Sequence, residues 1–583
     1  MESTAKQCKN CKQDFVIEPD DFAFYGKIKV PPPTWCPDCR TQRRLTFRNE
    51  RSFHKRKCDL CSKDIISVYS PDSPYRVFCT TCWYGDKWDP ITFGKNYNFS
   101  EPFLKQFQSL LKEVPRRALN NIKSLNSEYT NYAVANKNCY LGFSILYSED
   151  CAYGSRILHC KECFDCLDTQ KSELCYECIH CRDCSRSTFC EYSESLVDCH
   201  LCYDCKGLTN CFGCVGIRNQ SYYWLNQPLK KEEYEQKLQS IIQNEEEWEK
   251  ANEEYKKLLL SFPHRYARII KSQNATGDNI TNSKNCTNCF FTNEAEDSKN
   301  LLSCGKMKKS IDVSLDDESE LEYEIMSGQT NAHAMFGVAC WYSHDVQYSD
   351  SCTDSGDLFG CAGLRKKNYC ILNKQYSKEE YKELLPKIIA HMDEMPYKDS
   401  KDRGHQYGEF FPIEISPFAY NETVAQEYFT LSKEDAKSYG LAWRKPNTKE
   451  YTISIQPENA QKRGEEIPDS VTKEVVGCKH KGECNDQCST AFKILPQELA
   501  FYKRMNLPIP ILCPNCRHYR RMKERNPIKL NHRKCMCDYK VFKNTQKHSH
   551  HPEGQCPNEF ETSYAPDRKE IIYCEECYQN ETA

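Results

Sequence analysis

The sequence predicts a mixed, multidomain fold, in which small cysteine-rich modules at both ends flank two duplicated β-solenoid segments with capping helices. Two observations predict this fold. Cys-x-x-Cys pairs recur at both ends of the 583-residue chain, and the cysteines between the ends recur with a period of twelve residues. The 40 cysteines are several times the share of an ordinary protein. Thiols therefore define most of the architecture.

Four Cys-x-x-Cys pairs lie within the first 82 residues. They are Cys8 with Cys11, Cys36 with Cys39, Cys58 with Cys61, and Cys79 with Cys82. Two residues between thiolates allow one turn of the chain to present both sulfurs to a tetrahedral zinc ion. Two such pairs complete a four-thiolate site with no open coordination position. Such closed sites are structural rather than catalytic.

The C-terminal hundred residues repeat this plan, so the sequence predicts about four zinc ions per chain. The predicted ligands there are Cys484, Cys488, Cys513, Cys516, Cys535, Cys556, Cys574 and Cys577. Two choices stay open, because either Cys478 or Cys484 and either Cys535 or Cys537 could be a ligand. An insertion of 18 residues carries His548, His550 and His551, which we expect to form a solvated loop rather than to bind zinc.

The residues around these pairs resemble the zinc-ribbon family of treble-clef type, over about 35 residues at each end. The matching residues are Cys8, Cys11, Phe15, Phe24, Tyr25, Pro31 to Pro33, Cys36, Pro37, Cys39 and Arg40. The whole layout also resembles multi-ribbon proteins of candidate-phyla bacteria. In a treble clef the second cysteine pair lies at the start of a helix. The resemblance therefore implies helices that begin near Pro37 and Pro514.

Two short segments concentrate positive charge on a chain whose net charge is −3. Residues 40–57 and 517–534 each hold eight Lys or Arg residues and one Glu. On a helix the arginines would form one stripe, which suits phosphate because a guanidinium donates two bonds to one group. We expect RNA or DNA to bind at Arg40, Arg43, Arg44, Arg48, Arg51, Arg517, Arg520, Arg521 and Arg525. The alternatives are pairing with the acidic middle of the same chain, a protein partner, or solvation.

The cysteines between the two modules share one phase. All 15 from Cys139 to Cys214, and the seven from Cys286 to Cys370, fall at every third position. A fixed period with small residues in register predicts a solenoid with twelve residues per coil. The pattern resembles the coils of an insect antifreeze-type β-helix in geometry alone. We interpret these thiols as filler of a narrow core, with metal binding around Cys175 to Cys184, or disulfides, as alternatives.

Changes in the sequence pattern divide the chain into seven segments. These are a tandem module over 1–95, a helical connector over 96–126, the first solenoid over 127–225, a helix and linker over 226–275, the second solenoid over 276–375, a helical and mixed connector over 376–475, and the second tandem module over 476–583. Helices are expected over 101–114, over 228–260 as one long helix, over 377–392, and from Ser432 to Gly440. Residues 310–333 break the period and are expected to loop out.

The sequence contains no nucleophile–base pair, phosphate loop or dinucleotide fingerprint, so we expect a non-enzymatic protein. The leading hypothesis is a zinc protein that binds nucleic acid. The second is a scaffold or assembly protein that uses aromatic residues on the solenoid surface, namely Tyr140, Phe143, Phe164, Tyr176 and Tyr203. The third is thiol-redox or metal-storage activity. A polar first segment and the lack of long apolar runs predict a cytoplasmic protein without a signal peptide or membrane helix.

Overall fold

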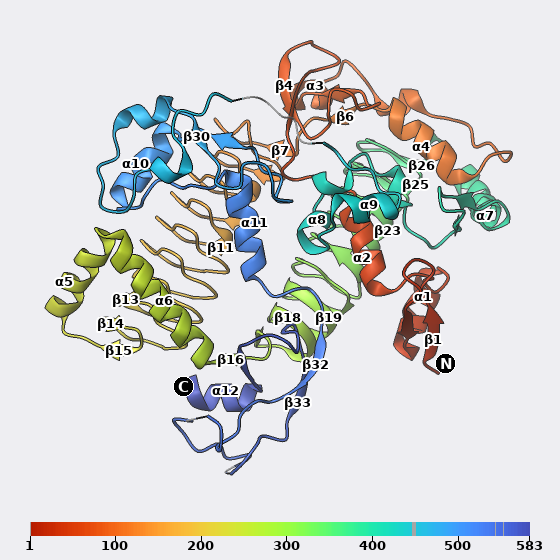
Figure 1. The fold of residues 1–583 in the computed structure, drawn as a ribbon. Coiled ribbons are helices and arrows are strands. Elements are labelled where there is room, and N and C mark those ends of the chain that lie inside the picture. The colour runs from red at the N-terminus through yellow and green to blue at the C-terminus, as the bar shows by residue number, and fades with distance from the viewer. Residues whose placement is uncertain (1, 446–450, 543, 552, 583) are drawn as a thin grey trace. The chain divides into compact units, whose positions relative to one another are not determined.

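The computed structural model of the chain describes residues 2–445, 451–542, 544–551 and 553–582. The chain forms two compact units, and each unit combines a terminal module with one region of the twelve-residue repeat. Unit 1 contains residues 1–119 and 267–444, and unit 2 contains residues 120–266 and 445–583. The N-terminal module therefore packs with the second repeat region, and the C-terminal module packs with the first (Figure 1).

The N-terminal module alternates short hairpins with helices. Its strands are β1 (Thr4–Gln7), β2 (Asp14–Ile17), β3 (His54–Lys57), β4 (Asp64–Ser67), β5 (Val77–Phe78) and β6 (Arg116–Arg117). Its helices are α1 (Pro19–Ile28), α2 (Pro37–Leu45), α3 (Thr80–Tyr84), the 3-10 turn η1 (Pro90–Phe93) and α4 (Phe103–Glu113). The strands pair as antiparallel hairpins, β1 with β2 and β3 with β4. Helix α2 begins at Pro37, as the resemblance implies.

The C-terminal module repeats this order in unit 2. Its strands are β30 (Val476–Gly477), β31 (Ala491–Phe492), β32 (Asn531–Lys534), β33 (Glu559–Thr562) and β34 (Ile571–Tyr573). Its helices are α10 (Pro496–Arg504), α11 (Pro514–Glu524) and α12 (Glu575–Thr582). Strand β34 pairs in parallel with β16 (Pro263–Arg265), which joins the module to the end of the first repeat region. Helix α11 begins at Pro514, which the resemblance also implies.

The first repeat region, residues 120–228, is a ladder of parallel pairs, called the first ladder below. Its strands are β7 (Asn121–Ile122), β8 (Ala133–Val134), β9 (Phe143–Leu146), β10 (Ser155–Leu158), β11 (Leu167–Gln170), β12 (Val197–His200), β13 (Thr209–Phe212), β14 (Tyr223–Trp224) and the antiparallel β15 (Gln227–Pro228). Residues pair with those twelve positions later, as Ser155 does with Leu167. Isolated bridges such as Tyr176 with Thr188 continue this register between β11 and β12. The register follows the predicted period.

The second ladder, residues 267–375, lies in unit 1. Its strands are β17 (Ile269–Ile270), β18 (Gln273–Thr281), β19 (Lys284–Asn293), β20 (Glu296–Lys299), β21 (Ile311–Ser314), β22 (Tyr323–Met326), β23 (Ala332–Val338), β24 (His344–Gln347), β25 (Gly356–Phe359), β26 (Asn368–Ile371) and β27 (Lys374–Gln375). The prediction that residues 310–333 loop out is wrong, because β21 pairs with β22 and β22 with β23 in the same register. Val313 and Ile325 occupy the core positions that cysteines hold elsewhere.

A left-handed residue at every third position turns the chain in both ladders. In the first ladder Tyr147, Asp150, Tyr153, Arg156 and His159 all have φ between 50° and 60°. This conformation is costly for residues other than glycine, and asparagine and aspartate tolerate it best. Backbone hydrogen bonds between successive coils compensate for the cost. The residue that follows each turn points inward, so cysteines one position later line the core.

Helices cover the C-terminal end of each ladder. The single helix predicted over 228–260 is wrong, since α5 (Lys231–Ile242) and α6 (Glu245–Ser261) are separated at Asn244, whose side chain caps α6. Both helices pack on the last coils of the first ladder, where Trp248 contacts Phe212. Helix α7 (Lys378–Glu394), capped by Ser377, covers β26.

The connector after α7 holds only short elements. They are β28 (Tyr397–Lys398), β29 (Gly404–His405), the 3-10 turns η2 (Ile413–Ile415), η3 (Tyr420–Glu422), η4 (Pro457–Asn459) and η5 (Asp469–Lys473), and the helices α8 (Ala425–Tyr428) and α9 (Lys433–Ser438). Ser432 caps α9 as predicted, because its hydroxyl accepts a hydrogen bond from the backbone N–H of Asp435.

Candidate metal centres and buried arginine clusters

The first candidate metal centre is formed by Cys8, Cys11, Cys36 and Cys39, whose sulfurs lie within 4.8 Å of one another. Cys8 follows β1, and Cys36 is the N-cap of α2. The backbone N–H of Cys36 donates to the Cys8 sulfur over 3.2 Å. Burial would raise the pKa of Cys8, but backbone N–H groups of Cys36, Cys11 and Asn10 lower it to about 7. The thiolate is the form that binds metal.

The second centre repeats this geometry with Cys58, Cys61, Cys79 and Cys82. Cys58 follows β3, and Cys79 is the N-cap of α3. The backbone N–H of Cys79 donates to the Cys58 sulfur over 3.3 Å, as Cys36 does to Cys8. The pKa of Cys58 is likewise about 7, because backbone hydrogen bonds outweigh the effect of burial. The sequence predicts these four-thiolate groups correctly.

The third centre corrects one predicted ligand. Its members are Cys478, Cys488, Cys513 and Cys516, so Cys478 takes the place expected for Cys484. Cys478 follows β30 in the position that Cys8 has after β1, and it accepts the backbone N–H of Cys513 over 3.3 Å. Cys484 lies in the longer loop of this hairpin, with its sulfur 3.6 Å from that of Cys516. The hairpin strand, rather than the spacing, decides which cysteine joins the group.

The fourth centre contains Cys535, Cys556, Cys574 and Cys577. Cys535 follows β32 and accepts the backbone N–H of Cys574 over 3.2 Å, which is the fourth occurrence of this hydrogen bond. This geometry answers the open choice in favour of Cys535 for this group. Cys537 belongs to a further group with His548, His551 and Cys577. The expectation of a solvated histidine loop is therefore wrong, since His548 is fully buried.

Each four-cysteine group offers only thiolates and leaves no position for substrate, which fits a structural metal ion. The described residues contain more than four groups that could hold a metal, although some groups share a cysteine, so there are more candidate sites than the four that the sequence predicts. No helix in the described ranges is long and apolar enough to cross a membrane.

The arginines of α2 lie against the second ladder instead of facing solvent. Arg40 contacts Asp312 through Nε at 2.8 Å, and Arg43 contacts Glu324 through Nη2 at 2.8 Å. Arg44 lies 3.3 Å from the other oxygen of Glu324. All three guanidinium groups are at most 3% exposed, and both carboxylates are equally buried. The Arg43 guanidinium also stacks over Trp35, at 4.5 Å from the ring centroid.

Unit 2 contains the same cluster at duplicated positions. Arg517 and Arg521 each lie 2.9 Å from an oxygen of Asp165, and Arg521 also lies 3.1 Å from Glu177. Asp165 and Glu177 occupy left-handed turn positions twelve residues apart, as Asp312 and Glu324 do in unit 1. Arg520 also pairs with Glu177, but its side chain is 49% exposed, unlike the buried side chains of Arg517 and Arg521. Figure 1 shows α11 along the first ladder.

The chain matches no protein-family model and no curated protein sequence.

Two further arginines of the basic segments 40–57 and 517–534 also pair with carboxylates. Arg48 contacts Glu50 and donates to the Ser327 hydroxyl, and Arg525 lies 3.0 Å from Asp168. Burial would raise the pKa of Asp168, but Arg156, His180 and Arg525 lower it to about 2. A carboxylate that stays ionised at neutral pH therefore holds Arg525 in place.

These guanidinium groups do not form a solvent-exposed stripe in the structure described, and nucleic acid binding at them stays a prediction. Eight of the nine arginines are less than one tenth exposed, and carboxylates of the same unit face at least seven of these. The eight are Arg40, Arg43, Arg44, Arg48, Arg51, Arg517, Arg521 and Arg525. The alternative of pairing with acidic residues of the same chain describes the clusters correctly. Except for Glu50, these partners lie hundreds of residues away, so local spacing in the sequence does not indicate the pairing.

The aromatic residues expected on a solvent face are largely covered. Phe143, Phe164, Tyr176 and Tyr203 are all less than one tenth exposed. Phe164 stacks on Phe501 with ring centroids 4.3 Å apart, and Tyr203 lies 3.2 Å from Tyr564, hydroxyl to hydroxyl. The C-terminal module, rather than a partner, covers this surface of the first ladder.

The ladder cysteines are buried. All 40 cysteines of the chain are free thiols, with no disulfide between them. Their thiols contact backbone carbonyls: Cys178 Sγ lies 3.6 Å from the oxygen of Tyr176 and 3.4 Å from that of Ser187. Ser172 and Ser187 occupy the same kind of position and donate to the carbonyl two residues earlier. These contacts favour the interpretation of the thiols as core filler.

We expect Cys178→Ser to lower the free energy of unfolding by less than about 1.5 kcal/mol, because serine already fills neighbouring positions and the volume is nearly conserved. Urea unfolding and metal analysis of the full chain measure the effect. Cys513→Ser is the matched control, and it should release metal. A Cys178→Ser protein that loses a metal ion would contradict the filler role.

Proposed function

We propose that this chain is a non-enzymatic, zinc-stabilised scaffold that binds a protein partner. One observation carries the proposal: the same buried arginine–carboxylate cluster occurs in both units. Ionised groups that are removed from water need partners, and these have them within their own unit. The modules therefore serve as fixed parts of the architecture, and their arginines are committed to the ladders rather than to phosphate.

Zinc is the metal that best suits the four-cysteine groups. Four thiolates in a tetrahedral arrangement favour zinc or an iron–sulfur centre, and hairpin-plus-helix knuckles with paired cysteines are typical of structural zinc sites. The thiolate groups with Cys8 and Cys58 are preorganised by backbone N–H donors. Bound zinc would fix the start of each arginine-bearing helix, because Cys36 and Cys513 are the N-caps of α2 and α11.

Each ladder, closed on itself as a solenoid, would display a stiff surface of mixed charge. Oppositely charged side chains alternate at twelve-residue steps on exposed positions, as Lys137 with Glu149, and Lys206 with Glu194. Lys306 with Glu318 forms the same type of pair in the second ladder. A surface of alternating sign carries no extended positive field, which nucleic acid binding requires. It suits a protein surface with its own mixed charges.

The test is cross-linking in the native cell with a lysine-reactive reagent and mass spectrometry of the linked peptides. We expect reproducible links from ladder lysines such as Lys137, Lys161 and Lys206 to one protein partner, and none in a zinc-depleted sample.

A parallel titration uses a labelled single-stranded RNA at about 50 and about 200 mM salt. The Arg520→Ala variant is titrated beside the wild-type chain, because Arg520 is the most exposed of the nine arginines and its loss should leave the fold intact. Tight, salt-sensitive binding that falls tenfold or more in Arg520→Ala would overturn the scaffold proposal in favour of nucleic acid.

A further inference from the structure

A second group of metal-ligand side chains lies beside the fourth thiolate centre, within the C-terminal module. It consists of Cys537, His548, His551 and Cys577, whose ligand atoms lie within 4.8 Å of one another. All four residues are at most 5% exposed. Cys577 belongs to both this group and the four-cysteine group. The two groups are therefore adjacent and share one sulfur.

Three separations in this group are close to the edges of a tetrahedral zinc site. With bonds of about 2.3 Å to sulfur and about 2.05 Å to nitrogen, the edges should be about 3.6 Å for sulfur to nitrogen and about 3.3 Å between nitrogens. Cys537 Sγ lies 3.5 Å from His548 Nδ1, and that nitrogen lies 3.2 Å from His551 Nε2. His551 Nε2 lies 3.1 Å from Cys577 Sγ. Two of these three separations are within about 0.1 Å of the expected edges, and the third is about 0.5 Å shorter.

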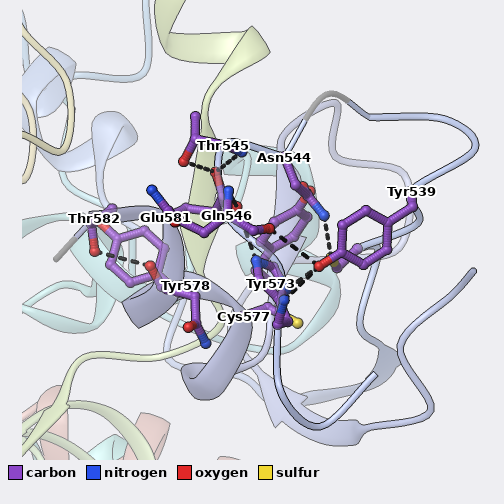
Figure 2. A network of polar contacts seen from close by, with 12 residues as sticks. Tyr539, Asn544, Thr545, Gln546, Tyr573, Cys577, Tyr578, Glu581 and Thr582 are labelled. Atoms are coloured by element: carbon purple, nitrogen blue, oxygen red, sulfur yellow. Dashed lines mark hydrogen bonds and ion pairs between the residues drawn. The ribbon is translucent and has the colours of Figure 1, made fainter. Parts of the chain in front are cut away.

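Surrounding groups hold the ligands in a metal-binding orientation. His548 Nε2 lies 2.9 Å from the Glu581 carboxylate, so its N–H points there and leaves Nδ1 with a lone pair toward Cys537. Carboxylate partners of this kind are the usual support of zinc-bound histidines. Thr545 donates to Glu581 through both its backbone N–H and its hydroxyl, at 2.8 Å each. Figure 2 shows Glu581 of α12 beside Thr545 and Gln546.

Cys537 is supported in the same way. The side-chain amide of Asn544 donates to its sulfur over 3.1 Å, and the Tyr573 hydroxyl donates to the oxygen of that amide over 2.7 Å. Figure 2 shows Asn544 and Tyr573, the two residues of the second contact. A donated hydrogen bond stabilises the negatively charged thiolate, which is the ligating form. The site thus has supporting hydrogen bonds on both a sulfur and a nitrogen ligand.

We propose that the C-terminal module binds two zinc ions, with the Cys577 thiolate bridging them. One ion takes Cys535, Cys556, Cys574 and Cys577, and the second takes Cys537, His548, His551 and Cys577. This inference rests on the proposed zinc binding of the four-cysteine groups. Five thiolates within a few ångströms would carry five negative charges, and two dicationic ions balance four of them, whereas a single ion balances two.

His550 also lies near the same sulfurs. Its Nε2 is 3.3 Å from Cys577 Sγ and 3.5 Å from Cys556 Sγ, and its ring is 19% exposed. Its Nδ1 faces the exposed carboxylate of Glu576 at 3.4 Å. We do not assign His550 as a ligand, because its ring is partly exposed whereas the four proposed ligands are at most 5% exposed. The N-terminal module has Leu60 where Cys537 stands, so it binds only one ion at the matching centre.

The experiment is metal counting by native mass spectrometry on the full zinc-loaded chain, combined with zinc X-ray absorption. We expect about five zinc ions and a zinc–zinc distance of about 3.5–4 Å, as in other two-metal sites. Cys537→Ser, His548→Gln and His551→Ala should each remove one ion and the zinc–zinc signal. His532→Ala, an exposed histidine of β32, and His550→Ala should each retain all ions.

The outcomes separate the two proposals. A folded wild-type chain with about four ions and no zinc–zinc signal would overturn the bridged pair while leaving the scaffold proposal intact. Unchanged counts in the Cys537 and His548 variants would do the same. A chain that folds without any zinc would overturn both. Circular dichroism of each variant shows whether a lost ion reflects a lost ligand or a lost fold.

Discussion

Asp165→Ala is expected to lower the free energy of unfolding of unit 2 by about 3–5 kcal/mol. The substitution leaves Arg517 and Arg521 buried beside a missing carboxylate, and both are at most 2% exposed. Glu177 and Glu498 remain nearby, but the buried cluster loses one of its three carboxylates, and a buried charge without its partner costs far more than the intact pair contributes. Hydrogen exchange of the amides in β11 and α11 measures the loss within unit 2, independently of unit 1.

The matched control is Asp198→Ala in the same ladder. Asp198 pairs with Arg186, and both side chains are at least one third exposed, so water can replace the contact. We expect a change of at most about 1 kcal/mol, as for other surface pairs. Asp312→Ala should reproduce the large effect in unit 1, because Asp312 faces Arg40 and Arg44 in the same way. Equal and small effects for Asp165 and Asp198 would contradict the buried-cluster argument.

Removal of zinc should detach both modules from their ladders. Structural zinc contributes about 10–16 kcal/mol to the folding of small modules, which is more than most domains possess in total. Cys513 and Cys516 begin α11, so loss of their metal should unfold the helix that carries Arg517 and Arg521. Tryptic cleavage after these two arginines should then accelerate at least about 100-fold after chelation, which corresponds to loss of about 3 kcal/mol of local stability.

Cleavage at Lys231 in the exposed start of α5 provides the internal control, because its rate should change little. Readdition of zinc should restore protection at Arg517 and Arg521. A chain that keeps both sites protected while metal analysis shows no bound zinc would contradict the structural role of the thiolate groups.

Much of the metal chemistry could be predicted because ligand spacing is a local property. The pairs at Cys8 and Cys58 follow directly from the two-residue interval between thiolates. Spacing left the choice between Cys478 and Cys484 open, because the hairpin loop that separates Cys478 from Cys488 is longer than a knuckle turn. Spacing also left the choice between Cys535 and Cys537 open and did not predict His548 as a neighbour of Cys537, since an inserted loop brings them together. Only the folded backbone reveals such ligands.

The partners of the arginines could not be predicted, because they depend on which module packs against which ladder. The period of twelve residues was readable from the cysteines, and the left-handed turns leave a weak trace as asparagine, aspartate and glycine at every third position. Asp165 and Asp312 belong to this set of turn residues. Their residue type fits the turn positions, and their carboxylates also face the buried guanidinium groups.

Each unit combines two distant segments of the chain, so the ribosome makes the two parts of one unit at different times. The segment of unit 2 that contains the first ladder is complete once residue 266 has emerged, but the segment that contains its module lies in residues 445–583. At about 5–20 residues per second the intervening translation takes roughly 15–65 s. During that interval Phe164, Tyr176 and the carboxylate of Asp165 lack their covering module, so nascent chains should be a chaperone substrate. In unit 1 the module is made first, so the second ladder can pack against it as soon as that ladder emerges.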